Sequence, residues 1–182
     1  MRTITALPKA AVSILAASML VACDRDPVGM ENLNAPTPAL AAVKVAASGT
    51  FAQSAITSLD VRTAGGNTIL AQTSNGSISG TLSGPFQDDL KVVIHPNGKF
   101  NAQFTMTCTC TVDGKSGVLE IVASDRGELV SPTLASFAGR AVIKRGTGDL
   151  AGLHGVLQIQ GTVDVTTGLS TYAYSGTLNW QP

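Results

Sequence analysis

Three sulfur-bearing side chains, Met106, Cys108 and Cys110, stand at alternate positions and are the residues of this chain best suited to chemistry. If this segment is a strand, alternation places all three on one face, where soft sulfur groups could bind Cu(I). A disulfide would need a local bulge, because same-face Cβ atoms in a regular strand lie about 7 Å apart and a disulfide needs about 4 Å. We favour free thiols that pack as small core residues, and we predict neither a metal nor a cofactor.

The remaining polar side chains do not identify a catalytic residue. His95 and His154 have no second ligand at metal-binding spacing, which favours solvated or capping roles. Asp88 and Asp89 would point to opposite faces of a strand and could not serve one substrate, so we interpret them as a surface turn. The run Gly146-Thr147-Gly148 lacks the Lys-Ser/Thr pair and the long helix of a phosphate loop. The sequence therefore leaves catalysis open.

Aromatic side chains form a second set at alternating positions that we expect to face inward. Such residues suit a packed core, and they equally suit the lining of a cavity for a small apolar ligand. Both interpretations stay open for the full set of candidate cavity-lining residues, which are Phe100, Phe104, Met106, Cys108, Cys110, Tyr172, Tyr174 and Trp180.

Long strands would have to position these side chains. From Phe100 to Val112 apolar residues alternate without interruption with threonine and amide side chains, which predicts one strand with an apolar and a polar face. The same pattern predicts further strands over Phe51–Arg62, Thr68–Thr73, Ser77–Phe86, Leu90–His95, Val118–Ala123, Ala138–Arg145, Gly155–Val165 and Tyr172–Trp180.

Short Gly-rich joints separate most of these segments, Asn75-Gly76 among them. The longest insertion, Ser124–Ser136, is predicted to be a loop that crosses the barrel or covers one of its mouths. About eight or nine strands with short connections predict an all-β fold, with a closed antiparallel barrel preferred over a sandwich.

The N-terminus carries an export signal. Arg2 and Lys9 precede an uncharged apolar run that is too short to span a bilayer, and the run ends at Leu20-Val21-Ala22-Cys23. This ending resembles the lipobox of bacterial lipoproteins, which implies cleavage before Cys23 and lipidation of its thiol. We therefore expect a signal peptide over residues 1–22, a lipid-anchored flexible linker over 23–48, a barrel domain over 49–182, and a place in the bacterial cell envelope.

Charge and composition exclude one class of partner. The whole chain has twelve basic and twelve acidic residues, and loss of Arg2 and Lys9 with the signal peptide leaves an acidic excess of two. No basic stripe is present, so nucleic-acid binding is disfavoured. Abundant Gly, Ser and Thr fit many turns and strands better than helices.

The segment from Gly146 to Gly155 reads G-T-G-D-L-A-G-L-H-G. It resembles the signature of a bacterial family of unknown function, DUF3224, which is related to the allene oxide cyclase barrels. The run Val61–Thr68 and the turn Asp113–Gly117 fit the same resemblance. It implies a barrel over roughly Gly49–Trp180, in a superfamily that includes cyclases and dirigent proteins, and it carries over no catalytic residue.

Three functions follow as expectations. The first is a membrane-tethered barrel that binds a small apolar ligand or an envelope partner without catalysis. The second is a cofactor-free isomerase or cyclase resembling the allene oxide cyclases, and the third is a structural lipoprotein with a filled barrel. A buried ionisable group facing a cavity would favour the enzyme, whereas a filled interior would favour the structural role. The oligomeric state is left open.

Overall fold

The computed structural model describes residues 43–181. Cys23, the predicted signal peptide over residues 1–22 and the predicted linker up to residue 42 lie outside the described residues. Within the described part, no helix is long and apolar enough to cross a membrane. The barrel begins at Val43, six residues before the predicted boundary, because the stretch up to Ser48 pairs with the last strand and places Ala47 in the core.

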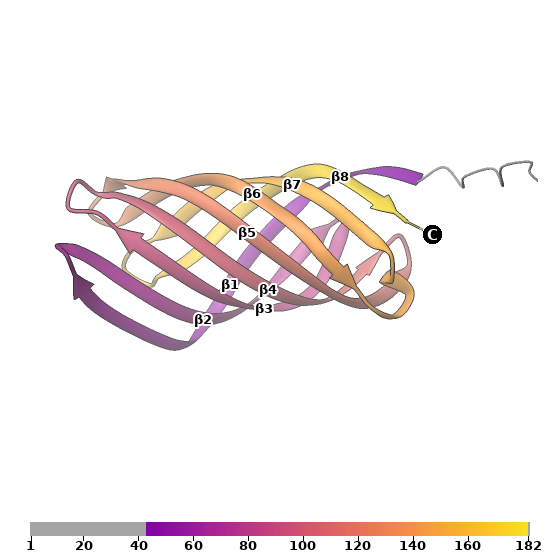
Figure 1. Ribbon diagram of the computed structural model, residues 1–182, viewed down its shortest axis with the longest axis horizontal. Helices are drawn as coiled ribbons and strands as arrows, with labels where there is room; N and C mark the ends of the chain where they lie inside the picture. The colour runs from indigo at the N-terminus through magenta and orange to yellow at the C-terminus, as the bar shows by residue number, and fades with distance from the viewer. Residues whose placement is uncertain (1–42, 182) are drawn as a thin grey trace, which may run out of the picture. The chain divides into compact units, whose positions relative to one another are not determined.

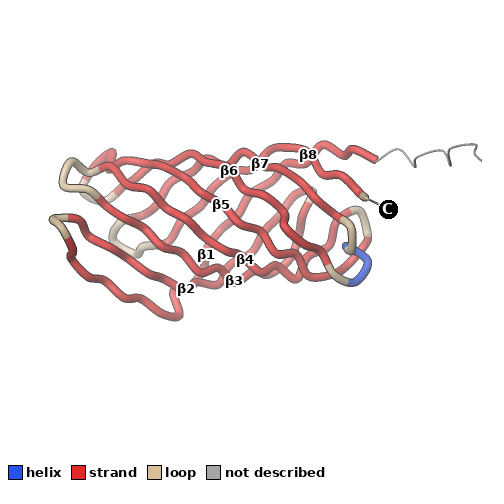
Figure 2. Tube along the Cα trace, viewed as in Figure 1, coloured by secondary structure: helices blue, strands red, loops and turns tan. Residues whose placement is uncertain are grey.

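The described residues form eight antiparallel strands that close into one barrel, as predicted, with each strand paired to its sequence neighbours and β1 paired to β8 (Figures 1 and 2). The β1–β8 pairing that closes the barrel runs from Val43 to Ala52 on β1, and residues 53–64 of β1 pair with β2 alone. The strands are β1 Val43–Ala64, β2 Asn67–Gly80, β3 Leu82–Ile94, β4 Lys99–Val112, β5 Lys115–Ser131, β6 Leu134–Gly146, β7 Leu153–Asp164 and β8 Leu169–Trp180, and a short 3₁₀ helix, η1, spans Gly148–Leu150.

Two predicted irregularities are wrong. Strand β2 runs straight through Asn75-Gly76, where we predicted a turn, and the break falls instead at Thr81, inside the predicted strand Ser77–Phe86. Three predicted strands are therefore two, β2 and β3. Gly76 faces inward there, and a Cβ at this position would collide with the ring of Phe86, so this glycine serves packing. The predicted loop Ser124–Ser136 is a hairpin, because β5 and β6 pair along this stretch up to Ser131 and Leu134.

The two ends of the barrel differ. We call the end that carries the β1–β2, β3–β4, β5–β6 and β7–β8 turns the mouth, which lies to the left in Figure 1. The chain enters β1 and leaves β8 at the opposite end. Six side chains pack that end and each is at most 2% exposed; we call them the barrel floor, and they are Leu82, Val112, Leu119, Leu150, Leu153 and Leu178.

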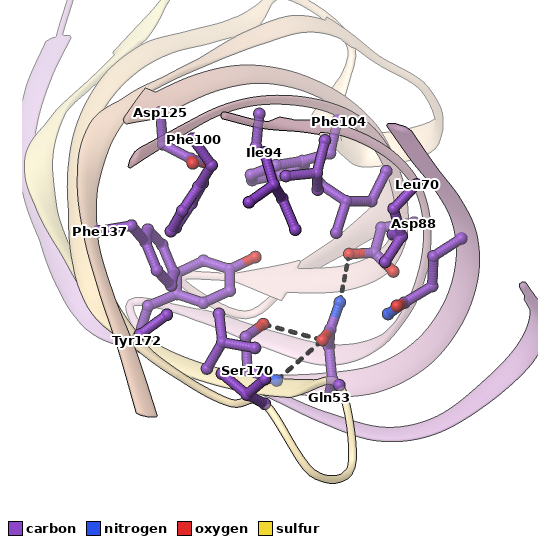
Figure 3. A pocket seen from close by; sticks show the side chains of 18 of the residues that line it. Gln53, Leu70, Asp88, Ile94, Phe100, Phe104, Asp125, Phe137, Ser170 and Tyr172 are labelled. Carbon is purple, nitrogen blue, oxygen red and sulfur yellow. Dashed lines mark hydrogen bonds between the residues drawn. The ribbon is translucent and has the colours of Figure 1, made fainter. Parts of the chain in front are cut away.

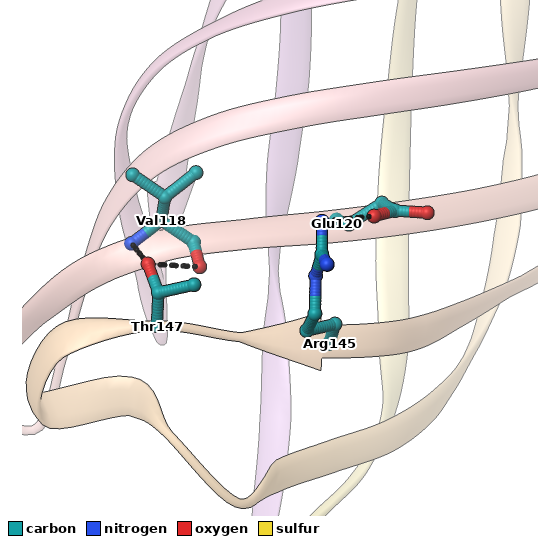
Figure 4. Close-up of polar contacts among 4 residues, drawn as sticks. All are labelled: Val118, Glu120, Arg145 and Thr147. Atoms are coloured by element: carbon teal, nitrogen blue, oxygen red, sulfur yellow. Dashed lines mark hydrogen bonds and ion pairs between the residues drawn. The ribbon is translucent and has the colours of Figure 1, made fainter.

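The segment Gly146–Gly155 completes this floor. Thr147 links β6 to β5, because its backbone N–H donates to the carbonyl of Val118 at 2.9 Å. Its hydroxyl also accepts from the Val118 N–H at 3.3 Å (Figure 4). The chain then turns through η1, which inserts Leu150 into the interior. Beside it, exposed Arg145 and Glu120 form an ion pair of 3.1 Å (Figure 4). The motif therefore acts as a structural plug.

Cys108 and Cys110 are joined by a disulfide, which corrects our preference for free thiols. Their Cα atoms are 5.3 Å apart, closer than the about 7 Å of a regular strand. The β3–β4 ladder is interrupted beside them, between the Ser83–Thr111 and Phe86–Cys108 pairs. Proline at position 85 has no N–H to give to that ladder, and the local departure from regular pairing lets the two sulfur atoms meet.

Candidate functional site

A cavity of about 160 Å³ fills the mouth half of the barrel (Figure 3). Its walls are mostly aliphatic and aromatic, and two of its lining residues, Leu129 and Val165, are 45% and 42% exposed. Its lining consists of Gln53, Leu70, Gln72, Asp88, Leu90, Val92, Ile94, Phe100, Ala102, Phe104, Asp125, Leu129, Ala135, Phe137, Val163, Val165, Gly168, Ser170 and Tyr172.

Strand alternation brings this lining together. On β3 every second residue from Phe86 to Ile94 points inward, and on β5 the inward series runs from Leu119 to Asp125. Glycines make room where a large side chain crosses a neighbouring strand. A Cβ at Gly127 would collide with the ring of Phe100, and one at Gly139 would collide with Asp125.

Aromatic packing holds Tyr172 in place. Its ring stacks on Phe51 with centroids 4.8 Å apart, and Phe137 meets it edge-on at 5.6 Å. Phe104 lies tilted against it at 6.1 Å. These contacts hold the ring, while its buried hydroxyl has no hydrogen-bond partner among residues 43–181. Burial, together with the nearby Asp88 and Asp125, raises the pKa of this phenol well above its usual value, so it stays neutral.

Asp88 belongs to a polar cluster on one wall. The amide of Gln53 donates to Ser74 Oγ at 2.7 Å and to Asp88 Oδ2 at 2.9 Å, and the Ser74 hydroxyl donates to Asp88 Oδ1. The Gln53 carbonyl accepts from both the N–H and the hydroxyl of Ser170 (Figure 3). Desolvation by burial still raises the pKa of Asp88, although its hydrogen bonds oppose the shift.

Asp125 stands on another wall without such partners. It is 7% exposed, and no hydrogen bond to its carboxylate is found among the described residues. Burial raises the pKa of Asp125 from 3.8 to about 6. The amide nitrogen of Gln72, Nε2, is a further buried polar atom of the lining without a partner. Several polar atoms of the cavity therefore have no partner within the described part of the chain.

The predicted cavity-lining residues divide between the two halves of the barrel. Phe100, Phe104 and Tyr172 line the cavity. The others do not: Met106, Cys108, Cys110 and Tyr174 are buried toward the floor, and Trp180 stacks under the Lys115 ammonium at 4.0 Å.

Tyr174 shows why the inward-facing pattern alone was insufficient. Its hydroxyl accepts from the backbone N–H of Leu82 at 2.9 Å and donates toward the backbone carbonyls of Ser79 and Leu82, so its polar end is used within the wall. Inward orientation tells which side chains enter the barrel, and it does not tell at which height the interior is packed.

Sequence reasoning missed both aspartates of the cavity. Asp88 and Asp89 do point to opposite faces, as alternation requires, but they lie within β3 and not in a surface turn. Asp125 was assigned to a loop that does not exist. The signal was present in the spacing, because each aspartate continues an inward-facing series of apolar residues, Phe86-Asp88-Leu90 and Ile121-Ala123-Asp125.

The histidines take no part in the cavity. His95 lies at the β3–β4 turn, where its ring nitrogens pair with Asn67 Oδ1 at 3.0 Å and Asn101 Nδ2 at 3.1 Å. His154 lies on β7, outside the cavity lining. No group of three or more His, Cys, Asp or Glu side chains suited to a metal ion occurs within residues 43–181.

Solved structures similar to this chain are known. No family model matches the chain. No curated protein matches it either. The structure is similar to that of the pterocarpan synthase dirigent protein GePTS1, with a TM-score of 0.48 and 16% identity over 78% of this chain and 92% of that chain.

Proposed function

We propose that this protein is a bacterial envelope lipoprotein whose barrel holds one small, mostly apolar ligand. The observation that carries the proposal is the cavity of about 160 Å³ above the packed barrel floor. An apolar cavity of about 150 Å³ is enough to hold a benzene ring. Eight-stranded barrels have room for one small ligand where side chains leave the interior unfilled.

The mouth supports entry of an apolar molecule. Leu129 and Val165 line the cavity and are also exposed at its rim. Val130 and Leu134 at the β5–β6 turn are 60% and 39% exposed, so this part of the mouth carries several exposed apolar side chains. Burying such surface against a ligand stabilises the complex at about 25 cal/mol per Å².

The tether is proposed from the sequence at Cys23. Two or three acyl chains on one cysteine give stable membrane attachment, whereas a single chain is marginal. The barrel begins at the end opposite the mouth, so attachment through the N-terminus leaves the entrance to the cavity free. The DUF3224-type relation suggested by Gly146–Gly155 belongs to the same proposal.

Native mass spectrometry of the protein purified from its own host tests ligand binding. The version to use begins at Asp24, because the barrel closes within residues 43–180 and acyl chains would complicate the spectrum. We expect a retained mass that Ala135→Leu removes, since Ala135 lines the cavity. Ala138→Leu is the matched control, because the same change lies on the exposed face of the same strand. A retained mass that survives Ala135→Leu would place the ligand elsewhere.

Acyl-chain labelling tests the tether. Cys23→Ser should abolish labelling and leave an uncleaved or unanchored precursor, because a hydroxyl does not replace the thiol in lipidation. Cys110→Ser is the matched control and should label normally, since that residue lies inside the barrel. Equal labelling of the wild type and of Cys23→Ser would contradict the lipoprotein assignment.

A second candidate function is a cofactor-free isomerase or cyclase of the kind suggested by the resemblance to allene oxide cyclases. The observation that favours it is the pair of buried carboxyl groups facing the cavity, Asp88 and Asp125, whose pKa values are both raised by burial. A structural lipoprotein with a filled barrel is the least favoured of the three functions, because the mouth half is hollow.

A further inference from the structure

The ionisable groups of the cavity are all acidic or phenolic. Asp88 faces it from β3, Asp125 from β5 and Tyr172 from β8 (Figure 3). No lysine, arginine or histidine is among the lining residues. The basic side chains nearest to Asp125 in the ladder, Arg126 and Arg140, are exposed on the outer face of the barrel. When these groups ionise they therefore carry only negative charge, and no basic residue of the lining compensates it.

The two carboxylates differ in the hydrogen bonds that they accept from the protein. Asp88 accepts hydrogen bonds from Ser74 and Gln53, so its charge is partly compensated by fixed dipoles. Asp125 has no such donor, and its neighbours across the ladder, Ala102 and Gly139, offer none from their side chains. A buried, unpaired carboxylate is costly, and a donor or cation supplied by a ligand would remove that cost.

Aromatic groups stand where such a cation would lie. Figure 3 shows Asp125 and Asp88 on different walls, with the Tyr172 hydroxyl directed into the space between them. That hydroxyl is buried and without a partner, so its oxygen is free to accept a further hydrogen bond. The rings of Phe104 and Phe137 pack against Tyr172, and aromatic faces attract ammonium groups most strongly when water is excluded.

We propose that the ligand is a small cationic molecule, an apolar or aromatic body that carries one protonated amine. Its ammonium donates to the Asp125 carboxylate and to the Tyr172 hydroxyl oxygen, and its body fills the space among the aliphatic and aromatic walls. This inference rests on the proposed ligand-binding function and names the chemical class of the ligand.

Binding should depend on pH in a defined direction. The pKa of Asp125 lies at about 6 because of burial, so about one tenth of it is ionised at pH 5 and nearly all of it at pH 8. If only the ionised form binds the ammonium, the apparent affinity falls about tenfold from pH 8 to pH 5. A ligand that accepts a hydrogen bond from the protonated carboxyl of Asp125 would instead bind more tightly at pH 5 than at pH 8.

Calorimetric titration with two probes of similar shape tests the inference. Benzylamine is cationic and benzyl alcohol is neutral throughout this pH range. With the protein that begins at Asp24, benzylamine should bind more tightly than benzyl alcohol at pH 8, and this preference should be about tenfold smaller at pH 5. Asp125→Asn should remove the preference and keep alcohol binding. Asp89→Asn on the outer face is the matched control and should leave both affinities unchanged.

The outcomes separate this inference from the function on which it rests. If benzyl alcohol binds as tightly as benzylamine at pH 8, the cationic class is wrong and the apolar ligand site stands. A benzylamine preference that persists in Asp125→Asn refutes the assignment to Asp125. If neither probe binds, the ligand-binding function fails together with the inference.

Discussion

Asp125 should make the barrel less stable as the pH rises. Its carboxyl is buried without a hydrogen bond, and the folded protein therefore favours the protonated form. The perturbation is Asp125→Asn, which keeps the shape of the side chain and removes its ionisation. The quantity to follow is the difference in unfolding free energy between the variant and the wild type as a function of pH.

The magnitude follows from the shift of this pKa from 3.8 to about 6. Between these values the folded state binds one proton more than the unfolded state, so the unfolding free energy falls by about 1.4 kcal/mol per pH unit. The full shift corresponds to about 3 kcal/mol of unfolding free energy, which is lost once the pH exceeds the pKa of Asp125 in the folded protein. The variant lacks this loss, so its advantage over the wild type should grow by about 3 kcal/mol from pH 3.5 to pH 7.5.

Urea unfolding at half-unit pH steps measures this difference. Asp88 is present in both proteins, so its own contribution largely cancels in the subtraction. Any constant effect of the new amide shifts the whole curve without changing its slope. A difference that is flat with pH, or that favours the wild type at high pH, would refute the view that Asp125 is a desolvated and unpaired acid.

Three further changes test other parts of the structure. Phe104→Asp should lower the unfolding free energy by about 3–5 kcal/mol in chemical denaturation, because it removes apolar burial and adds an unpaired charge. Thr109→Asp, on the outer face of β4, should change it by less than about 0.5 kcal/mol. Similar losses in the two variants would show that the assignment of inward and outward residues on β4 is wrong. Maleimide should label unfolded protein at Cys108 and Cys110 only after reduction, and labelling before reduction would contradict the disulfide. Because the disulfide closes a very short loop, its removal should lower the unfolding free energy by only about 1.5 kcal/mol. Leu150→Ala should destabilise the floor by about 2–5 kcal/mol and Asp149→Ala should not; equal effects in thermal unfolding would show that η1 is not a plug.

The fold could be predicted because alternation is a local property. The series from Phe100 to Val112 alternates strictly, and the observed strand, Lys99–Val112, matches it within one residue. The turn signals were less reliable. Asn75-Gly76 has the composition of a hairpin turn, but the inward glycine accommodates the Phe86 ring, and this tertiary contact decides its role. The Ser124–Ser136 stretch contains charges and a proline, which concealed its continuous pairing.

The site was only partly predictable, for a physical reason. Alternation shows that Phe104, Cys108 and Tyr174 all point inward, but the boundary between the packed half and the hollow half depends on which strands meet at each height. The polar members were discounted because an aspartate on an inward face contradicts the pattern of a filled core. That contradiction was the informative signal, because ionisable groups buried against the apolar pattern are concentrated at functional sites.

Methyl-resolved NMR titration with benzyl alcohol tests most directly the claim that the mouth half of the barrel is a ligand site. Leu90, Val92, Ile94 and Val163 report on the cavity, and Leu119, Leu153 and Leu178 report on the barrel floor. We predict saturable shifts of the cavity methyls with one-to-one stoichiometry, and floor methyls that stay in place. Absence of saturation, or shifts confined to outer methyls such as those of Val118 and Val156, would contradict a ligand-binding barrel.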